Sequence, residues 1–298
     1  GYYSSLALPG GNFVVGSVNW SLGKGAATWV DGRLGAAGEV SSSNSLVGEA
    51  SGDAVGVYLT PLANGNYVVS SRIGAPVGKG AVTWGSGLSG VRGLISSANS
   101  LVGQQAGDDV GLVSCNAGGS GSNCVSPGVQ ALSNGNYVVA SPGWDNGVIA
   151  DVGAITWRDG SVGIAEVVSP SNSLIGATAG DQLGQLSLTS FPNLGVIDLP
   201  NGSYVVSSPF WDSPSAVDVG AVTWADGTGP TTGTVSEANS LIGSQAGDQV
   251  GSGMRSGTGN TTTYIIPSPF WDNGSVANAG AVTLGDPTVG TTGVVGSG

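Results

Sequence analysis

Three Trp-Asp pairs are the side chains of this chain whose types and spacing could bind a ligand. An indole face beside a carboxylate suits a sugar, because the ring stacks on apolar C–H groups while the carboxylate accepts hydrogen bonds from hydroxyls. The alternative is an Asx-type turn, with the Trp packed on a neighbouring unit. Trp20 is followed by Ser21, which weakens the sugar interpretation. The pairs are Trp144 with Asp145, Trp211 with Asp212, and Trp271 with Asp272.

Four further acids recur at equivalent places, namely Asp53, Asp108, Asp181 and Asp248. They could form one metal or ligand site per unit. They could equally accept backbone N–H groups and hold a turn, as Asp does in many loops. Recurrence in every unit favours the structural role. The sequence therefore predicts structural turn acids and no metal site.

Residues for catalysis are scarce. The chain has no His to serve as a general base at neutral pH. It shows no Gly-x-Ser-x-Gly elbow with triad partners. The pair Asp108-Asp109 is adjacent, but neighbouring strand positions point to opposite faces. A glycosidase needs only two carboxylates, so this alternative stays open from the sequence alone. We nevertheless expect a protein without enzymatic activity or cofactor.

Cys115 and Cys124 enclose a Gly-, Ser- and Asn-rich segment that can turn back on itself. A disulfide between them would close a loop of ten residues and stabilise the fold by about 2.7 kcal/mol. Free thiols or a weak metal site are the alternatives, although zinc would lack ligands. We expect the disulfide, and with it an oxidising, extracellular setting.

The chain is acidic, with 19 acidic and 7 basic residues among 298. Without a basic cluster, the sequence argues against nucleic-acid binding and against attraction to anionic membranes. No apolar run is long enough for a membrane span. The start at Gly1 shows no signal peptide, which we interpret as a mature or trimmed chain.

The elements that must position these residues follow from an internal repeat. A Gly-Ala-x-Thr-Trp/Leu motif opens at Gly25, Gly80, Gly153, Gly220 and Gly280. The first four copies each precede a Gly-Asp motif, whose Asp lies 28 residues after the opening Gly. A fixed spacing predicts one structural unit, repeated. Val, Thr, Tyr and Trp favour strands, Asn-Gly favours hairpin turns, and no segment shows a helical period.

Four short strands per unit predict an all-β fold: a β-propeller of about five four-stranded blades. The expected blades are 1–52, 53–107, 108–180, 181–247 and 248–298 within one repeat domain, 1–298. A β-solenoid repeat array is the alternative. Trp29, Trp84, Trp157 and Trp224 end the third strands, where we expect them to pack between units, with Leu284 in the fifth.

The motifs together resemble a known group. Gly247–Gly251 (GDQVG), the Asn201-Gly202 turn, Tyr204–Pro209 (YVVSSP) and Gly220–Trp224 (GAVTW) are similar to FG-GAP blades of integrin-type β-propellers. They are more similar to Gly-rich repeats of secreted bacterial surface proteins of the filamentous-haemagglutinin kind. The resemblance implies secretion and an adhesive or surface-structural role. Integrin-type blades often hold calcium in an Asp-rich loop, but the turn Leu62–Asn66 has no carboxylate, so calcium is not carried over.

We therefore expect a non-catalytic extracellular structural or adhesive protein at the cell surface. Its partners would be further copies of itself or surface and matrix components, because the repeat register at the two ends would allow head-to-tail assembly. The alternative is a lectin-like propeller that binds glycans through the Trp-Asp loops.

Overall fold

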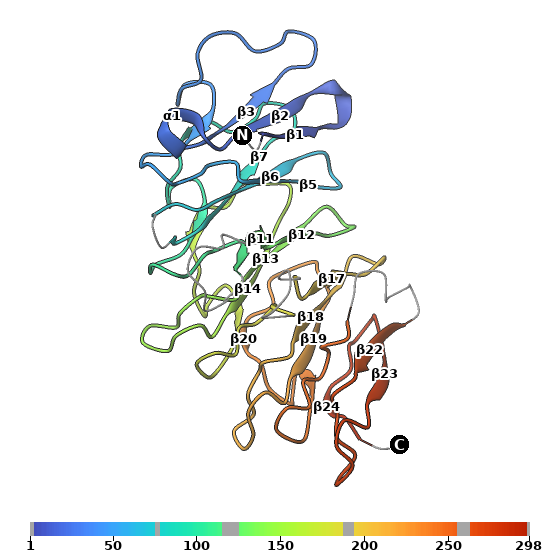
Figure 1. The fold of residues 1–298 in the computed structure, drawn as a ribbon. Helices are drawn as coiled ribbons and strands as arrows, with labels where there is room; N and C mark the ends of the chain where they lie inside the picture. Colours follow the sequence, from blue (N-terminus) through green and yellow to red (C-terminus); the bar gives the residue numbers. More distant parts are fainter. Residues whose placement is uncertain (1–2, 75–77, 115–124, 187–193, 255–262, 297–298) are drawn as a thin grey trace.

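Tight turns rich in glycine close a series of antiparallel hairpins, and each hairpin begins one sheet of the fold (Figure 1). The computed structural model describes residues 3–74, 78–114, 125–186, 194–254 and 263–296. Gly65, Gly135 and Gly202 have φ of 88°, 91° and 88°, the left-handed conformation that such a turn requires. The Asn-Gly signals thus mark where the strands reverse.

Four five-stranded sheets share one plan. The first three strands of a repeat are antiparallel neighbours, a short fourth strand follows, and a two-residue strand from the next repeat completes the sheet. The first sheet contains β1 (Tyr3–Ala7), β2 (Phe13–Ser17), β3 (Ala26–Val30), β4 (Leu46–Val47) and β8 (Gly93–Leu94). The second contains β5 (Tyr58–Pro61), β6 (Tyr67–Ser71), β7 (Ala81–Gly85), β9 (Leu101–Val102) and β15 (Glu166–Val167).

The other two sheets follow the same plan further along the chain. The third contains β12 (Val129–Ala131), β13 (Tyr137–Ser141), β14 (Ala154–Arg158), β16 (Leu174–Ile175) and β20 (Gly233–Thr234). The fourth contains β17 (Val196–Asp198), β18 (Tyr204–Ser208), β19 (Ala221–Ala225), β21 (Ser240–Ile242) and β24 (Gly293–Val294). Two hairpins stand apart: β10 (Leu112–Ser114) with β11 (Val125–Pro127), and β22 (Tyr264–Ser268) with β23 (Ala281–Gly285).

The fifth strand of each of these sheets comes from the repeat that follows. It runs parallel to the fourth strand of the preceding repeat, so that Leu46 pairs with Gly93 and Leu174 pairs with Gly233. Every other strand pair within the four sheets is antiparallel. The predicted four-stranded blade is therefore wrong by one strand, because a repeat gives its short segment to its neighbour.

Helix is nearly absent, as the lack of a helical period predicted. In the described part of the chain it is limited to the 3-10 turn η1 (Pro9–Gly11) and the single turn α1 (Trp20–Gly23). Ser21 and Leu22 have positive φ inside α1, so even this turn is irregular.

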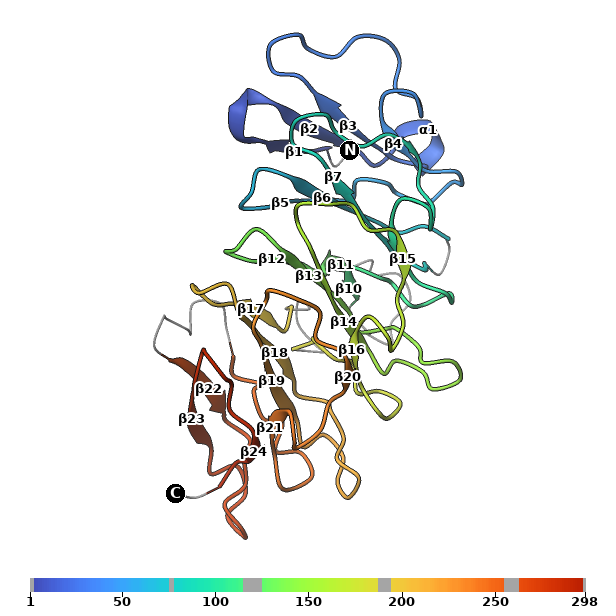
Figure 2. The same cartoon turned by 180° about the vertical axis from the view of Figure 1, so that it is seen from behind.

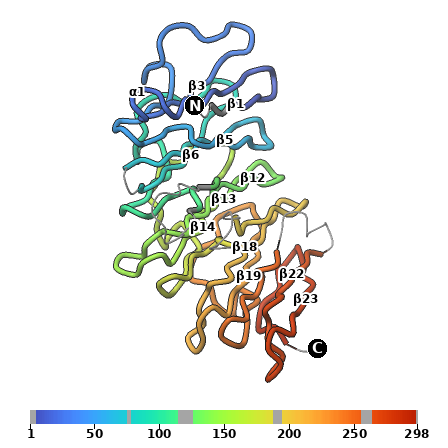
Figure 3. Tube along the Cα trace, in the orientation of Figure 1, coloured from blue at the N-terminus to red at the C-terminus, as the bar shows by residue number. Residues whose placement is uncertain are grey.

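The sheets form an open row (Figures 1 and 2). Colour runs along the row from one end to the other in the tube view, and the two termini lie at opposite ends (Figure 3). The predicted closed propeller is thus not formed. A ring requires the last sheet to pack against the first, whereas here each buried cluster of the described residues joins neighbouring repeats. The solenoid alternative anticipated an open array, although these units are separate sheets.

The hydrophobic core lies between the repeats. Each of the four clusters of buried apolar side chains draws on two neighbouring repeats. Val138 and Ile155 of the third repeat, for example, pack with Tyr204 and Trp211 of the fourth. Burial between neighbours therefore replaces a single central core, as in other repeat proteins.

Candidate functional site

The recurring acids lie at the junctions between repeats, where each carboxylate accepts several backbone N–H groups. Asp108 Oδ2 accepts from Gln104 N at 2.6 Å and Gln105 N at 2.8 Å, both in its own repeat. Asp108 Oδ1 accepts from Asp145 N of the next repeat at 3.1 Å. One side chain therefore fixes a turn and attaches the following Trp-Asp loop to it.

Asp181 and Asp248 repeat this arrangement. Asp181 Oδ1 accepts from Asp212 N at 3.0 Å, and Asp248 Oδ1 accepts from Asp272 N at 2.9 Å. Asp53 also closes its own turn, but its Oδ1 accepts from Gly74 N at 3.1 Å, because the second repeat lacks a Trp-Asp loop. Each of the four acids thus closes a turn and contacts the following repeat.

Burial changes the ionisation of two of these acids. Asp108 and Asp181 are almost fully buried, and loss of water raises the pKa of both carboxyls above the ordinary value for Asp. The N–H donors oppose this shift, because they stabilise the charged form, but burial is the larger effect. Ionised Asp108 and Asp181 thus cost free energy that the hydrogen bonds only partly offset.

The carboxylate of each Trp-Asp loop accepts a hydrogen bond from a backbone N–H of the same loop. Asp145 Oδ1 accepts from Asp151 N at 2.8 Å, and Asp212 Oδ1 accepts from Asp218 N at 2.7 Å. Asp272 makes the same contact with Asn278. This is the loop-closing geometry of the structural alternative.

The indoles of these loops are largely withdrawn from solvent. Trp144, Trp211 and Trp271 are 2%, 3% and 7% exposed, and each belongs to a core cluster between two repeats. Their Nε1–H groups have no hydrogen-bond partner among the described residues. The broad ring faces that sugar stacking needs are therefore covered by protein.

A second set of Trp residues links each repeat to the next. The Nε1–H of Trp84 donates to the carbonyl oxygen of Gly160 at 2.8 Å, and Asn64 and Asn66 donate to the same oxygen. Gly87, Gly227 and Pro287 offer the equivalent carbonyls at the other steps. The predicted packing of these Trp residues between units is confirmed. The same prediction for Leu284 is wrong, because its side chain is 65% exposed.

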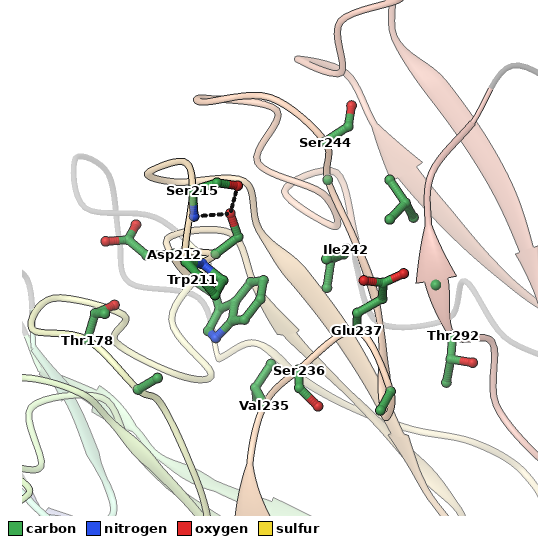
Figure 4. Close-up of a pocket in the computed structure, with 17 residues that line it drawn as sticks. Thr178, Trp211, Asp212, Ser215, Val235, Ser236, Glu237, Ile242, Ser244 and Thr292 are labelled. Atoms are coloured by element: carbon green, nitrogen blue, oxygen red, sulfur yellow. Dashed lines mark hydrogen bonds between the residues drawn. The ribbon is translucent and has the colours of Figure 1, made fainter.

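One large groove opens beside a Trp-Asp loop. It encloses about 1050 Å³ and lies against the fourth repeat, with walls from the third and fifth (Figure 4). Its apolar lining includes Trp211, Val235 and Ile242, and Figure 4 places Glu237 across from Trp211 in that view. Of the three predicted pairs, Trp211 with Asp212 lines this groove. Glu237 was not predicted from the sequence. A comparison of the repeats could have identified it, because the equivalent residues are Ser42, Ser97 and Pro170.

Among the described residues, no group of three or more His, Cys, Asp or Glu side chains is placed to hold a metal ion. No described helix is long and apolar enough to span a membrane. The predicted disulfide, Cys115 with Cys124, lies outside the described residues.

The fold and its junctions define an all-β repeat protein built from exchanged-strand sheets. The chain belongs to the family described as a repeat of unknown function (DUF5650), which matches five times, at residues 7–57, 61–112, 131–185, 198–252 and 259–298. No curated protein matches the sequence significantly. These five matched segments are the repeats of the chain.

Proposed function

We propose that this chain is a non-catalytic structural or adhesive array that is secreted and acts at the cell surface. The observation that carries the proposal is the recurrence of one set of contacts at successive junctions. At each of four steps a Trp indole donates to a carbonyl of the next repeat. Such a row has length and repeated surfaces, which suit a spacer or an adhesive rod.

The resemblance to repeats of secreted bacterial surface proteins supports the location. The motifs of Tyr204–Pro209 and Gly220–Trp224 carry that resemblance. The acidic composition and the expected disulfide between Cys115 and Cys124 agree with an extracellular setting.

Self-association is the part of the proposal that has a defined surface. Leu284 occupies the position at which the other repeats place a Trp against the repeat that follows, and it is 65% exposed. Val282, on the same strand face, is 70% exposed, whereas the equivalent Val222 is buried. Exposed apolar side chains at a position used elsewhere for contact favour docking of a second copy.

Light scattering after size exclusion, together with negative-stain imaging, tests self-association. We expect end-to-end oligomers that grow with concentration. Replacing Val282 and Leu284 together by Asp should leave monomers, whereas Leu88→Asp, at an exposed turn outside this face, should change nothing. A wild-type chain that stays monomeric at every concentration contradicts self-association and leaves a spacer role.

Glycan binding is the second candidate. If the chain binds a glycan, we expect binding at the groove beside Trp211 and Asp212 and not at all three Trp-Asp loops. Hydroxyl and carboxylate groups line this groove. Burial of the indole removes most of the stacking surface, so hydrogen bonds would have to supply the affinity. A glycan array with wild type and Trp211→Ala tests it, and Trp271→Ala is the control from another loop.

A further inference from the structure

Two side chains that bridge other junctions are absent beside the groove at Trp211. In the second repeat, Gln105 Nε2 donates to the carbonyl oxygen of Gly147 in the next Trp-Asp loop at 2.8 Å. In the fourth repeat, Gln245 Nε2 donates to the equivalent oxygen of Gly274 at 3.1 Å. The amide of a Gln thus occupies the space between one repeat and the next loop.

The third repeat has Thr178 at this position and Ala177 before it, where the second repeat has Gln104. Thr178 is too short to bridge, and its hydroxyl donates to Asp181 Oδ1 in its own turn at 2.5 Å. In the second repeat, Gln104 Nε2 also donates to the carbonyl oxygen of Val168, at 3.5 Å. Pro214 and Val235 occupy the positions of Gly147 and Val168, and here their carbonyls lack the Gln donors.

The groove therefore takes the place of the missing amides. Ala177, Thr178, Pro214 and Val235 all line it. The two residues whose counterparts in the preceding step, Gly147 and Val168, accept Gln N–H groups therefore line an open cavity here. A ligand that fills the groove must supply hydrogen-bond donors, because leaving such acceptors desolvated and unpaired costs free energy.

Charge defines the ligand further. Glu237 lines the groove at a position where the first three repeats have Ser42, Ser97 and Pro170. None of the described residues that line the groove is basic. From residue 198 to residue 298 the sequence has eight acidic residues and one basic residue, Arg255. The local field therefore repels anions and attracts cations.

We propose that this groove binds an alkylammonium or guanidinium group carried on an apolar stem. The N–H donors of the ligand take the place of the Gln amides at Pro214 and Val235, and its charge pairs with Glu237. The stem lies along Ile242 and Val294, which line the same cavity. A basic peptide and a polyamine share this chemistry. The site goes beyond the proposed structural role, which does not require it.

Calorimetric titration with spermidine and with an acetylated, amidated Lys-Lys-Lys peptide tests the site and separates the two sources. Glu237→Gln should weaken binding about tenfold, because it removes one charge-assisted hydrogen bond. The double variant Ala177→Gln with Thr178→Gln should abolish binding by restoring the side chains that fill this space in the second repeat.

Glu39→Gln is the matched control, since it removes one exposed carboxylate outside the groove and should leave binding unchanged. Circular dichroism confirms that each variant is folded. Equal binding by wild type and both groove variants overturns the inference, because it shows attraction to net charge alone. Binding of lactose or cellobiose at the groove, with neither cation bound, overturns it in favour of the glycan candidate.

Discussion

A single carboxylate joins two repeats at each of the four junctions, although only three of them attach a Trp-Asp loop. Asp108 shows how, because its two oxygens accept N–H groups from its own turn and from Asp145 of the next repeat. Asp181 and Asp248 do the same for the loops that follow them. The side chain thus replaces the backbone pairing that a loop cannot make for itself.

Replacing Asp108 by Ala should lower the free energy of unfolding by about 2–4 kcal/mol, because buried N–H groups would lose their acceptor. The midpoint of urea unfolding measures the change. Asp226→Ala is the control: this exposed carboxylate accepts one N–H, from Thr228, and its loss should cost below about 1 kcal/mol. Similar losses in both variants would contradict a special role for Asp108.

The same burial predicts an unusual pH dependence. Because the pKa of Asp108 and Asp181 is raised in the fold, the folded chain holds protons that the unfolded chain has already released. Their contribution to stability is therefore complete below the ordinary Asp pKa of about 3.9 and is lost as pH rises through the raised values.

Carbon-detected NMR titration of the carboxyl groups checks this prediction. Asp108 and Asp181 should titrate above the ordinary range, whereas Asp286 should titrate below it, because its hydrogen bonds with Thr288 lower its pKa. In Asp108→Asn, the share of the pH dependence that comes from Asp108 should vanish. Titration of Asp108 at or below the ordinary value would refute the prediction.

At the scale of elements, the turn after the third strand determines how closely two repeats approach. A Cβ built on Gly160 would lie 1.8 Å from the carbonyl oxygen of Gly135, in the hairpin turn of the same repeat. The carbonyl of Gly160 is also the one that Trp84 and Asn64 reach from the preceding repeat. Only a glycine leaves room for both contacts.

Gly160→Ala should therefore destabilise the chain by about 2–3 kcal/mol, since the turn must shift away from Trp84. Gly229→Ala is the control, because a Cβ there meets no atom within 4 Å. Thermal unfolding and the fluorescence of Trp84 report the two effects together. If both substitutions are equally harmless, close approach at Gly160 does not limit the junction.

Most of the long strands and their turns could be predicted from the sequence. The Asn-Gly turns and the Gly-Ala-Val-Thr-Trp motifs place the long strands, because a turn type and an alternating pattern are local properties. The exchanged strands were missed, since Gly93–Leu94 and Gly233–Thr234 have two residues each and show no period. The groove was missed for another reason: Ala177 and Thr178 carry meaning only when compared with Gln104 and Gln105.

At the scale of the whole molecule, the row follows from the geometry of each step. A sequence repeat predicts that neighbouring units pack alike, but the rotation between them decides between ring and row, and no residue pattern reports that rotation. The propeller prediction failed at this point. In the observed row the termini lie at opposite ends (Figure 3), so the steps from repeat to repeat do not close a ring.

An open row of similar junctions should tolerate removal of one period. Deleting residues 153–219 joins Val152 to Gly220, which occupies the same repeat position as Gly153. We expect a folded, shorter particle by circular dichroism and small-angle X-ray scattering. Deleting residues 153–212 removes fewer residues but breaks the register, and it should unfold. Equal behaviour of both deletions would argue against interchangeable junctions.

The fifth strand that each sheet receives from the next repeat affects how the number of repeats can change in evolution. Each period encodes one strand that it gives away and one edge that receives a strand, so a duplicated copy meets its neighbours through surfaces that already fit. Unequal recombination can therefore lengthen or shorten the protein in one event without inventing an interface. The length of the row then changes in steps of one whole repeat. A single position such as Thr178 can change in one repeat while the others keep their residue.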